Sequence, residues 1–153
     1  MTGRPSSMCG LTLIEMLVAI GVCGVLAAIA ISSFRSYAVK GKIATAESDI
    51  MAIATAIGQY TTLNGGPPPD LATVNFDKLL DPWGNPYVYQ SFTGLNGKGK
   101  MRKDKSLNPI NTQYDLYSMG ADGQSKMPLT APESKDDVIL AYDGNYIGLA
   151  SDF

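Results

Sequence analysis

The chain has 153 residues, a formal net charge of −2 and 17% charged residues, which suits one domain plus an N-terminal anchor. This mildly acidic balance gives no reason to expect nucleic acid as a partner, because phosphate binding needs a basic surface. The sequence contains no histidine, the commonest general base and transition-metal ligand, so the composition argues against an enzyme. Its two cysteines, Cys9 and Cys23, lie too near the N-terminus for a disulfide to cross-link the polar remainder.

The first predicted element is an apolar run from Leu11 to Ile31, whose 21 residues include one charge, Glu15. This length suffices for a membrane-spanning helix, which needs roughly 20 apolar residues. A cleaved secretory signal is one interpretation, and Ala28-Ile29-Ala30 offers its small-residue cleavage pattern, but its apolar region should be only about 7–15 residues long. A plain membrane anchor leaves Glu15 unexplained, because a carboxylate within a membrane helix costs about 2.5–3.5 kcal/mol.

A third interpretation accounts for Glu15 and for the residues before the run. The segment Gly10-Leu11-Thr12-Leu13-Ile14-Glu15 resembles the processing site of the type IV pilin and pseudopilin family. The resemblance implies that residues 1–10 are a leader peptide, cut off between Gly10 and Leu11 by a dedicated peptidase that then methylates the amine of Leu11. It also implies an assembly role for Glu15. In the filament core its carboxylate would neutralise the N-terminal amine of a neighbouring subunit, because unpaired buried charges are costly. The family usually has Phe where this chain has Leu11.

Beyond Ser32 the pattern becomes amphipathic, and no proline occurs from Thr12 to Gly66. Apolar residues recur at three- and four-residue steps, the spacing of one helix face: Ile43, Ala46, Ile50, Ile53, Ala54 and Ile57. Asn64-Gly65-Gly66, followed by three prolines, ends the pattern. We therefore expect one helix from about Thr12 to about Leu63. Residues 11–33 would form its transmembrane or filament-core part, and residues 34–65 an amphipathic continuation that needs a sheet to cover its isoleucine stripe.

Residues 66–153 form the predicted periplasmic globular domain, in which scattered Gly, Pro, Asn and Asp mark short strands joined by turns. The candidate strands are Tyr87–Phe92, Tyr114–Met119 and Tyr146–Ala150, and Val138–Tyr142 is ambiguous between a strand and a short helix. The sequence thus predicts an α+β, pilin-like fold. In it a long N-terminal α-helix packs on a small antiparallel β-sheet with a C-terminal loop region.

The most distinctive stretch of this domain is predicted to be a rigid turn, Asp81-Pro82-Trp83-Gly84-Asn85-Pro86-Tyr87. Its two prolines fix two φ angles, Gly84-Asn85 supplies a tight turn, and Trp83 and Tyr87 offer large apolar faces. The stretch holds no nucleophile–base pair, so we expect it to pin the start of a strand onto the helix.

This turn and the later segment Asp115-Leu116-Tyr117-Ser118-Met119-Gly120-Ala121-Asp122-Gly123 together resemble the major pseudopilin of type II secretion systems. The resemblance implies a structural, non-enzymatic subunit of a pseudopilus that drives protein export across the outer membrane. Before assembly it would span the bacterial inner membrane once, with its C-terminal domain in the periplasm. The implied partners are sister subunits in a helical filament, minor pseudopilins, the prepilin peptidase and methyltransferase, and an ATP-driven assembly platform of the inner membrane.

The sequence also departs from that family. The segment from Lys98 to Asn111 looks inserted, and the loop after Asp122 lacks the family's glycine-rich turn. The alternative function is a major or minor pilin of a type IV pilus, serving adhesion, motility or DNA uptake. Such pilins often carry a C-terminal disulfide loop, and no cysteine follows Cys23 in this chain.

A calcium ion is the one cofactor that the resemblance implies. Asp122, Asp136 and Asp137 flank a 13-residue loop, Gly123 to Lys135, and Ca²⁺ takes about six to eight oxygen ligands. The spacing alone fits solvated surface carboxylates equally well, since Asp-Gly is first a turn signal. The resemblance implies that Asp122, Asp137 and backbone carbonyls around Met119 and the loop hold the ion. Asp137 is preferred to Asp136 because it directly precedes the apolar Val138-Ile139.

A basic cluster lies in the segment that looks inserted: Lys98, Lys100, Arg102, Lys103 and Lys105. It could contact an acidic neighbouring subunit or an anionic surface. Three glycines nearby favour the simpler interpretation, a solvated and mobile loop.

Overall fold

The computed structural model describes residues 12–95 and 97–153. Its first element is the helix α1, which runs from Leu13 to Asn64, within one residue of both predicted ends. Gly65 closes α1 in the left-handed conformation, with φ of +78°, and donates its N–H to the Thr61 carbonyl at 2.8 Å. This is a common way to satisfy the last carbonyls of a helix.

The chain divides into two units, Met1–Val39 and Lys40–Phe153. The first is described from Thr12, and its apolar side chains are exposed; Leu13, Leu17 and Ile29 expose 78%, 61% and 62% of their surface. By length and composition α1 could cross a membrane, with a mean hydropathy of 2.5 in its most apolar window. The second unit holds the rest of α1 and the whole sheet.

The sheet has four strands in the order β1-β2-β3-β4, and every neighbouring pair is antiparallel. Its strands are β1 (Val88–Ser91), β2 (Tyr114–Ser118), β3 (Val138–Ala141) and β4 (Tyr146–Leu149). The expected strands are therefore confirmed, and the ambiguous segment at Val138 is a strand. Single 3₁₀ turns lie in the connections and after β4: Ala72–Val74, Lys98–Lys100, Pro132–Ser134, Tyr142–Gly144 and, after β4, Ala150–Asp152.

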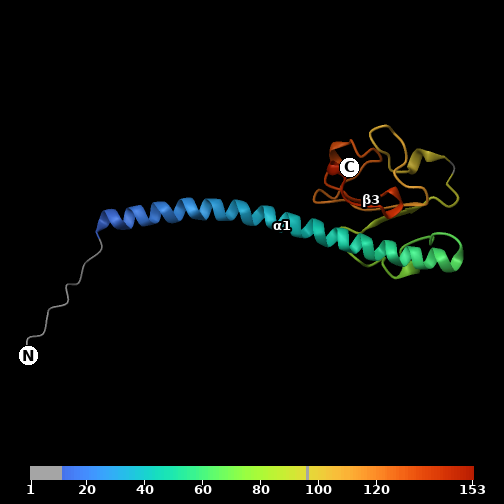
Figure 1. The fold of residues 1–153 in the computed structure, drawn as a ribbon, viewed down its shortest axis with the longest axis horizontal. Coiled ribbons are helices and arrows are strands. Elements are labelled where there is room, and N and C mark those ends of the chain that lie inside the picture. The colour runs from blue at the N-terminus through green and yellow to red at the C-terminus, as the bar shows by residue number, and fades with distance from the viewer. Residues whose placement is uncertain (1–11, 96) are drawn as a thin grey trace, which may run out of the picture. The chain divides into compact units, whose positions relative to one another are not determined.

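In the second unit the sheet lies beside α1 (Figure 1), and one face of the sheet covers the apolar stripe of the helix. Ile50, Ile53 and Ile57 are fully buried there against Leu116 and Leu140. Each such side chain contributes about 1.5–3 kcal/mol by leaving water. The expectation that a sheet buries the isoleucine stripe is confirmed.

The opposite face of the sheet carries a second, smaller core. Alternate residues of the same strands point there, as strand geometry requires, and Tyr117 pairs with Ile139 across β2 and β3. The connecting segments supply the cover, through Ile110, Leu129 and Ala150. The sheet is thus buried on both faces, by a helix on one and by loops on the other.

Shortening a buried residue of the stripe tests this packing. We expect Ile53→Ala to lower the free energy of unfolding by about 2–5 kcal/mol, because it leaves a cavity between α1 and the sheet. The control is Met51→Ala on the same helix, where 60% of the side chain is exposed and the loss should stay within about 0.5 kcal/mol. Urea titration of the full chain in detergent, followed by Trp83 fluorescence, measures both. Equal losses for the two variants would contradict the packing.

Candidate functional site

The first candidate site is the start of α1. The Thr12 hydroxyl oxygen accepts the Glu15 N–H at 3.3 Å, so Thr12 caps the helix and Glu15 takes the third helical position. Thr-x-x-Glu at these positions is the capping-box pattern, and a carboxylate is favoured beside the N-terminus of a helix. The sequence analysis did not predict this local role for Glu15, although the Thr-x-x-Glu spacing of Thr12 and Glu15 indicates it. The predicted cleavage and methylation positions, Gly10 and Leu11, lie outside the described residues.

The predicted rigid turn is organised by the carboxylate of Asp81, which is only 4% exposed. Its Oδ1 accepts the N–H groups of Trp83 and Asn85 at 3.0 and 2.8 Å, and its Oδ2 accepts the Ser118 hydroxyl at 2.5 Å. The backbone closes the turn as well, since the Asp81 N–H donates to the Asn85 carbonyl at 2.8 Å. Gly84 occupies the position with φ of +95°, which other residues rarely adopt.

Tyr87 ends this turn and fixes it to α1. Its hydroxyl donates to the Asp49 carboxylate at 2.8 Å, and its ring belongs to the core between helix and sheet. Burial, followed by the Asp49 carboxylate, raises the pKa of the Tyr87 hydroxyl far above its ordinary value. Beside it, the Lys42 ammonium lies 5.9 Å from the centre of the Trp83 ring. The turn therefore contacts the helix through polar and aromatic side chains together.

The structure joins the two segments that carry the pseudopilin resemblance. Ser118, fully buried, donates to Asp81 and accepts the Gly120 N–H at 3.1 Å. The Asn85 amide donates to the Gly120 carbonyl at 3.2 Å. Two stretches more than 30 positions apart in the sequence thus form one hydrogen-bonded unit at the end of β2.

The predicted calcium ligands lie beyond this unit, and protein donors engage all three aspartates of the loop, Asp122 and Asp136 through backbone N–H groups. Asp122 is exposed, and its Oδ1 accepts the Gln124 N–H at 2.8 Å within its own turn. Asp136, which was not selected from the sequence, accepts the N–H groups of Ala121 and Asp122 at 2.8 and 3.1 Å. Its backbone packs so tightly on Gly120 that an added Cβ there would lie 2.3 Å from the Asp136 carbonyl oxygen. Successive N–H groups of this kind form a natural anion site, and here Asp136 fills it.

The third aspartate, Asp137, is fully buried and paired with a buried arginine. Its Oδ2 lies 2.6 Å from the Arg102 Nη2 and accepts the Ser125 hydroxyl at 2.7 Å. Arg102 also donates from Nη1 to Ser125, and its guanidinium lies 4.1 Å from the centre of the Tyr117 ring. Burial raises the pKa of Asp137 to about 6, against the opposing effect of Arg102 and Ser125.

These contacts test whether the residues present fit a calcium ion. Among the described residues, no three His, Cys, Asp or Glu side chains gather as a metal site would require. Asp137 Oδ2 already holds the Arg102 guanidinium and the Ser125 hydroxyl, so an ion bound at the remaining oxygen would lie beside a fixed positive charge. As these side chains lie, they do not fit a site with about six to eight oxygens.

The basic cluster differs from its expectation at one position. Lys98, Lys100 and Lys105 are exposed, as a solvated loop predicts, but Arg102 is only 2% exposed. The Arg102 N–H donates to the buried Asp115 carboxylate at 2.6 Å, and Lys103 bonds through its backbone to Met127 and Leu129. The solvated-loop interpretation is therefore wrong for Arg102. The charge pattern alone could not reveal this, because the sequence looks the same whether the arginine among these lysines is buried or exposed to solvent.

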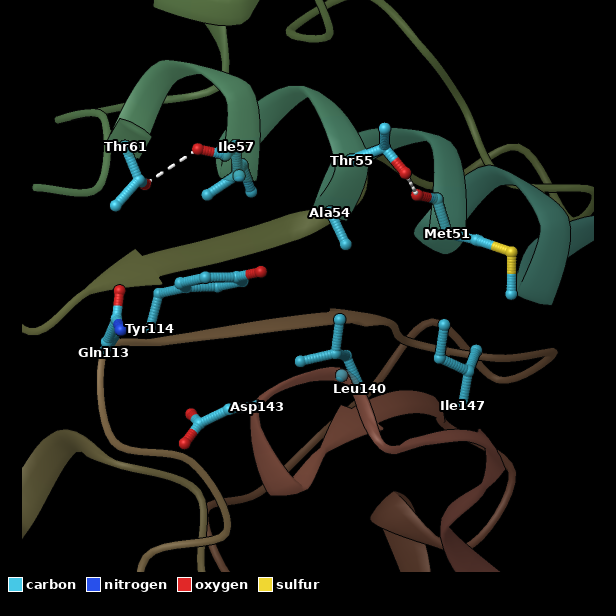
Figure 2. A pocket seen from close by; sticks show the side chains of 12 residues that line it. Met51, Ala54, Thr55, Ile57, Thr61, Gln113, Tyr114, Leu140, Asp143 and Ile147 are labelled. Carbon is cyan, nitrogen blue, oxygen red and sulfur yellow. Dashed lines mark hydrogen bonds between the residues drawn. The ribbon is translucent and has the colours of Figure 1, made fainter. Parts of the chain in front are cut away.

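An open groove of about 420 Å³ lies beside the α1 stripe, and Figure 2 shows it from close by. Met51, Ala54 and Ile57 line its helix side, and Leu140 and Ile147 line the strand side. Its acidic residue, Asp143, accepts the N–H and hydroxyl of Thr112 at 2.8 and 2.7 Å. The carboxylate is thus a structural acceptor. The Thr55 and Thr61 hydroxyls of the same lining donate to helix carbonyls at 2.8 and 2.7 Å, so they too serve the backbone.

Two comparisons with known proteins give a match to this chain. The family profile described as the prokaryotic N-terminal methylation motif matches residues 6–31. The type II secretion system core protein G of Pseudomonas aeruginosa is 32% identical over 136 residues, which cover 75% of this chain and 84% of that protein. A match over three quarters of the chain must extend well into the unit Lys40–Phe153. No solved structure gives a significant match.

Removing the Asp81 carboxylate tests its organising role in the turn. We expect Asp81→Ala to lower the free energy of unfolding by about 2–4 kcal/mol, because it leaves the buried Ser118 hydroxyl and two N–H groups without their acceptor. The control is Asp77→Ala, at an exposed position four residues earlier, where little change is expected. Urea titration of the full chain measures both variants, and a loss at Asp81 no larger than the control would refute the role.

Proposed function

The chain belongs to the family of the type II secretion system core protein G, the major pseudopilins, and from this premise we propose that it is a structural subunit of a secretion pseudopilus. The family is structural rather than enzymatic, so the function is mechanical. Subunits stored in the inner membrane are extracted and stacked by an ATP-driven platform, and the growing filament drives cargo across the outer membrane. The relation to core protein G favours this function over that of a type IV pilin, with which the methylation motif is shared.

One observation carries the proposal on the structural side, namely the contrast between the two parts of α1. From Lys40 onward its apolar stripe is buried by the sheet, whereas the apolar side chains between Leu13 and Ile31 are exposed. Those exposed apolar side chains need apolar surroundings, and these can come from outside the folded domain. Lipid serves before assembly and sister helices serve in a filament, since both are apolar.

The proposal assigns the chain to four regions. Residues 1–10 are a leader that the prepilin peptidase removes, and residues 11–33 cross the inner membrane and later line the filament core. Residues 34–65 and 66–153 lie in the periplasm, as the amphipathic part of the helix and the globular domain. Minor pseudopilins and the assembly platform are the further partners in this scheme. Calcium has no part in it, because Asp137 is already paired with Arg102.

Within this scheme Glu15 pairs with the methylated amine of Leu11 on a neighbouring subunit. In a nearly water-free core each charge alone is strongly unfavourable, and any other axial register would leave both unpaired. The capping of α1 by Thr12 is compatible with this role, because the bond from Glu15 uses its backbone N–H and not its carboxylate.

The leader prediction is tested at Gly10. We expect Gly10→Val to block processing, because the peptidase must fit the residue before the cut, whereas Gly3→Val in the same leader is processed normally. Mass spectrometry of the membrane-extracted protein reads the mature N-terminus, which should be N-methylated Leu11 in the unmodified chain. An intact leader in that chain, or cleavage after Ala30, would overturn the proposal.

The charge of Glu15 is tested by Glu15→Gln. Glutamine also suits the third position of a capping box, so this change removes the charge and preserves the helix start. We expect normal leader removal but at least a tenfold loss of pseudopili, because the neighbouring amine is left without a counter-charge. A loss of about 1.4 kcal/mol of binding free energy per subunit contact is enough for a tenfold effect. The control is Glu47→Gln in the periplasmic part of α1, which should assemble normally. Sheared filaments are quantified by immunoblotting, and normal assembly of Glu15→Gln would contradict the assigned role.

A further inference from the structure

We propose that Arg102 is the built-in cation of the C-terminal loop region, so that these loops fold around a guanidinium and need no calcium ion. The inference concerns the folding of the unit Lys40–Phe153 and does not depend on the proposed secretion function. It rests on the position of Arg102, on its partners, and on the state of the other acidic groups nearby.

The backbone of Arg102 is held in place from two directions. Its N–H donates to the Asp115 carboxylate at 2.6 Å, and its carbonyl accepts the Ile110 N–H at 3.1 Å. Asp115 is itself 1% exposed and also accepts the Asn111 amide at 3.1 Å. Burial raises the pKa of Asp115, while the Arg102 N–H and the Asn111 amide counteract it. The segment that looked inserted is therefore hydrogen-bonded into β2 at a buried point.

The side chain of Arg102 then reaches parts of the chain far apart in sequence. Its guanidinium lies over the ring of Tyr117 on β2, bonds to Ser125 in the loop, and pairs at 2.6 Å with Asp137 at the start of β3. Ser125 closes the arrangement by donating to the same Asp137 oxygen at 2.7 Å. A bound cation would hold these segments together in the same manner, by drawing oxygen atoms of separate loops to one charge.

The other aspartates nearby have separate protein donors. Asp122 accepts the Gln124 N–H, and Asp136 accepts the N–H groups of Ala121 and Asp122. Both hold local turns in shape without a metal. Of the three, only Asp137 lacks a backbone donor to its side chain, and it is the one that Arg102 neutralises.

Two buried atoms in the pair have no hydrogen-bond partner among the described residues, Arg102 Nε and Asp137 Oδ1. One is a donor and the other an acceptor. A calcium ion at Oδ1 would leave Nε unpaired and put a double positive charge beside the guanidinium. In a buried, low-dielectric site that repulsion would be strong.

The test compares calcium and chelator on the full-length mature chain in detergent. We expect the midpoint of thermal unfolding to be the same, within about 1 °C, with excess EDTA and with about 1 mM CaCl₂, a concentration that fills weak extracellular sites. Isothermal titration of the chelator-treated protein with CaCl₂ should show no saturable binding. A clear rise of the midpoint in calcium that Asp137→Asn abolishes would overturn the proposal, as would saturable binding.

The second arm changes Arg102 itself under the same conditions. Arg102→Gln should lower the midpoint by roughly 10 °C or more, because it leaves the Asp137 carboxylate buried without a counter-charge. Arg102→Lys, which keeps the charge, should lower it less. The control is Lys126→Gln, which removes the exposed ion pair with Glu133 and should change the midpoint by only a few degrees. Equal losses for the glutamine and lysine variants, or a loss at Arg102 no larger than the control, would refute the role. If Arg102→Gln does not fold, the calcium measurements on the unmodified chain still decide the proposal.

Discussion

The packing of one helical stripe on one face of the sheet is the constraint on which the rest of the structure depends. α1 presents a covered isoleucine stripe from Lys40 onward, but its apolar side chains between Leu13 and Ile31 are exposed. A single helix therefore needs two different covers. The sheet is a permanent cover for the second part, while the first part must exchange lipid for protein if the chain enters a filament. A helix can make this exchange without unpaired backbone groups, because its backbone hydrogen bonds lie within the segment.

With α1 fixed on one face, the opposite face of the sheet must be covered by whatever the connections provide. These connections are rich in turns and poor in apolar side chains, so they need polar groups to hold their shape. Asp81 does this at one end by gathering Trp83, Asn85 and Ser118, and Ser134 does it elsewhere by exchanging hydrogen bonds with the backbone of Lys126. Both polar side chains are buried, so the energetic cost of leaving either unpaired enforces one arrangement of the loops.

The fold was accessible from the sequence because its signals are local. The three-and-four spacing of Ile50, Ile53 and Ile57 predicts both the helix and its buried face, and Gly65 before three prolines predicts where the helix ends. The partners of buried charges were not accessible in this way. Nothing local distinguishes Arg102 from the lysines around it, and the apolar residues after Asp137 do not reveal that its partner is Arg102. Which of them is buried depends on where segments distant in sequence meet, and that depends on the fold as a whole.

The pairing of Arg102 with Asp137 also differs physically from a metal site in a way that bears on assembly. A calcium site is filled according to the concentration of the ion, and its contribution to stability varies with that concentration. A guanidinium on the chain is always present and always charged. The segment that looked inserted brings this cation, and the same segment supplies Ile110 to the core beneath it. One segment of the chain thus supplies both the buried positive charge and an apolar side chain of the core. The loop region can therefore fold without a bound ion, whatever the ionic conditions of the unassembled subunit.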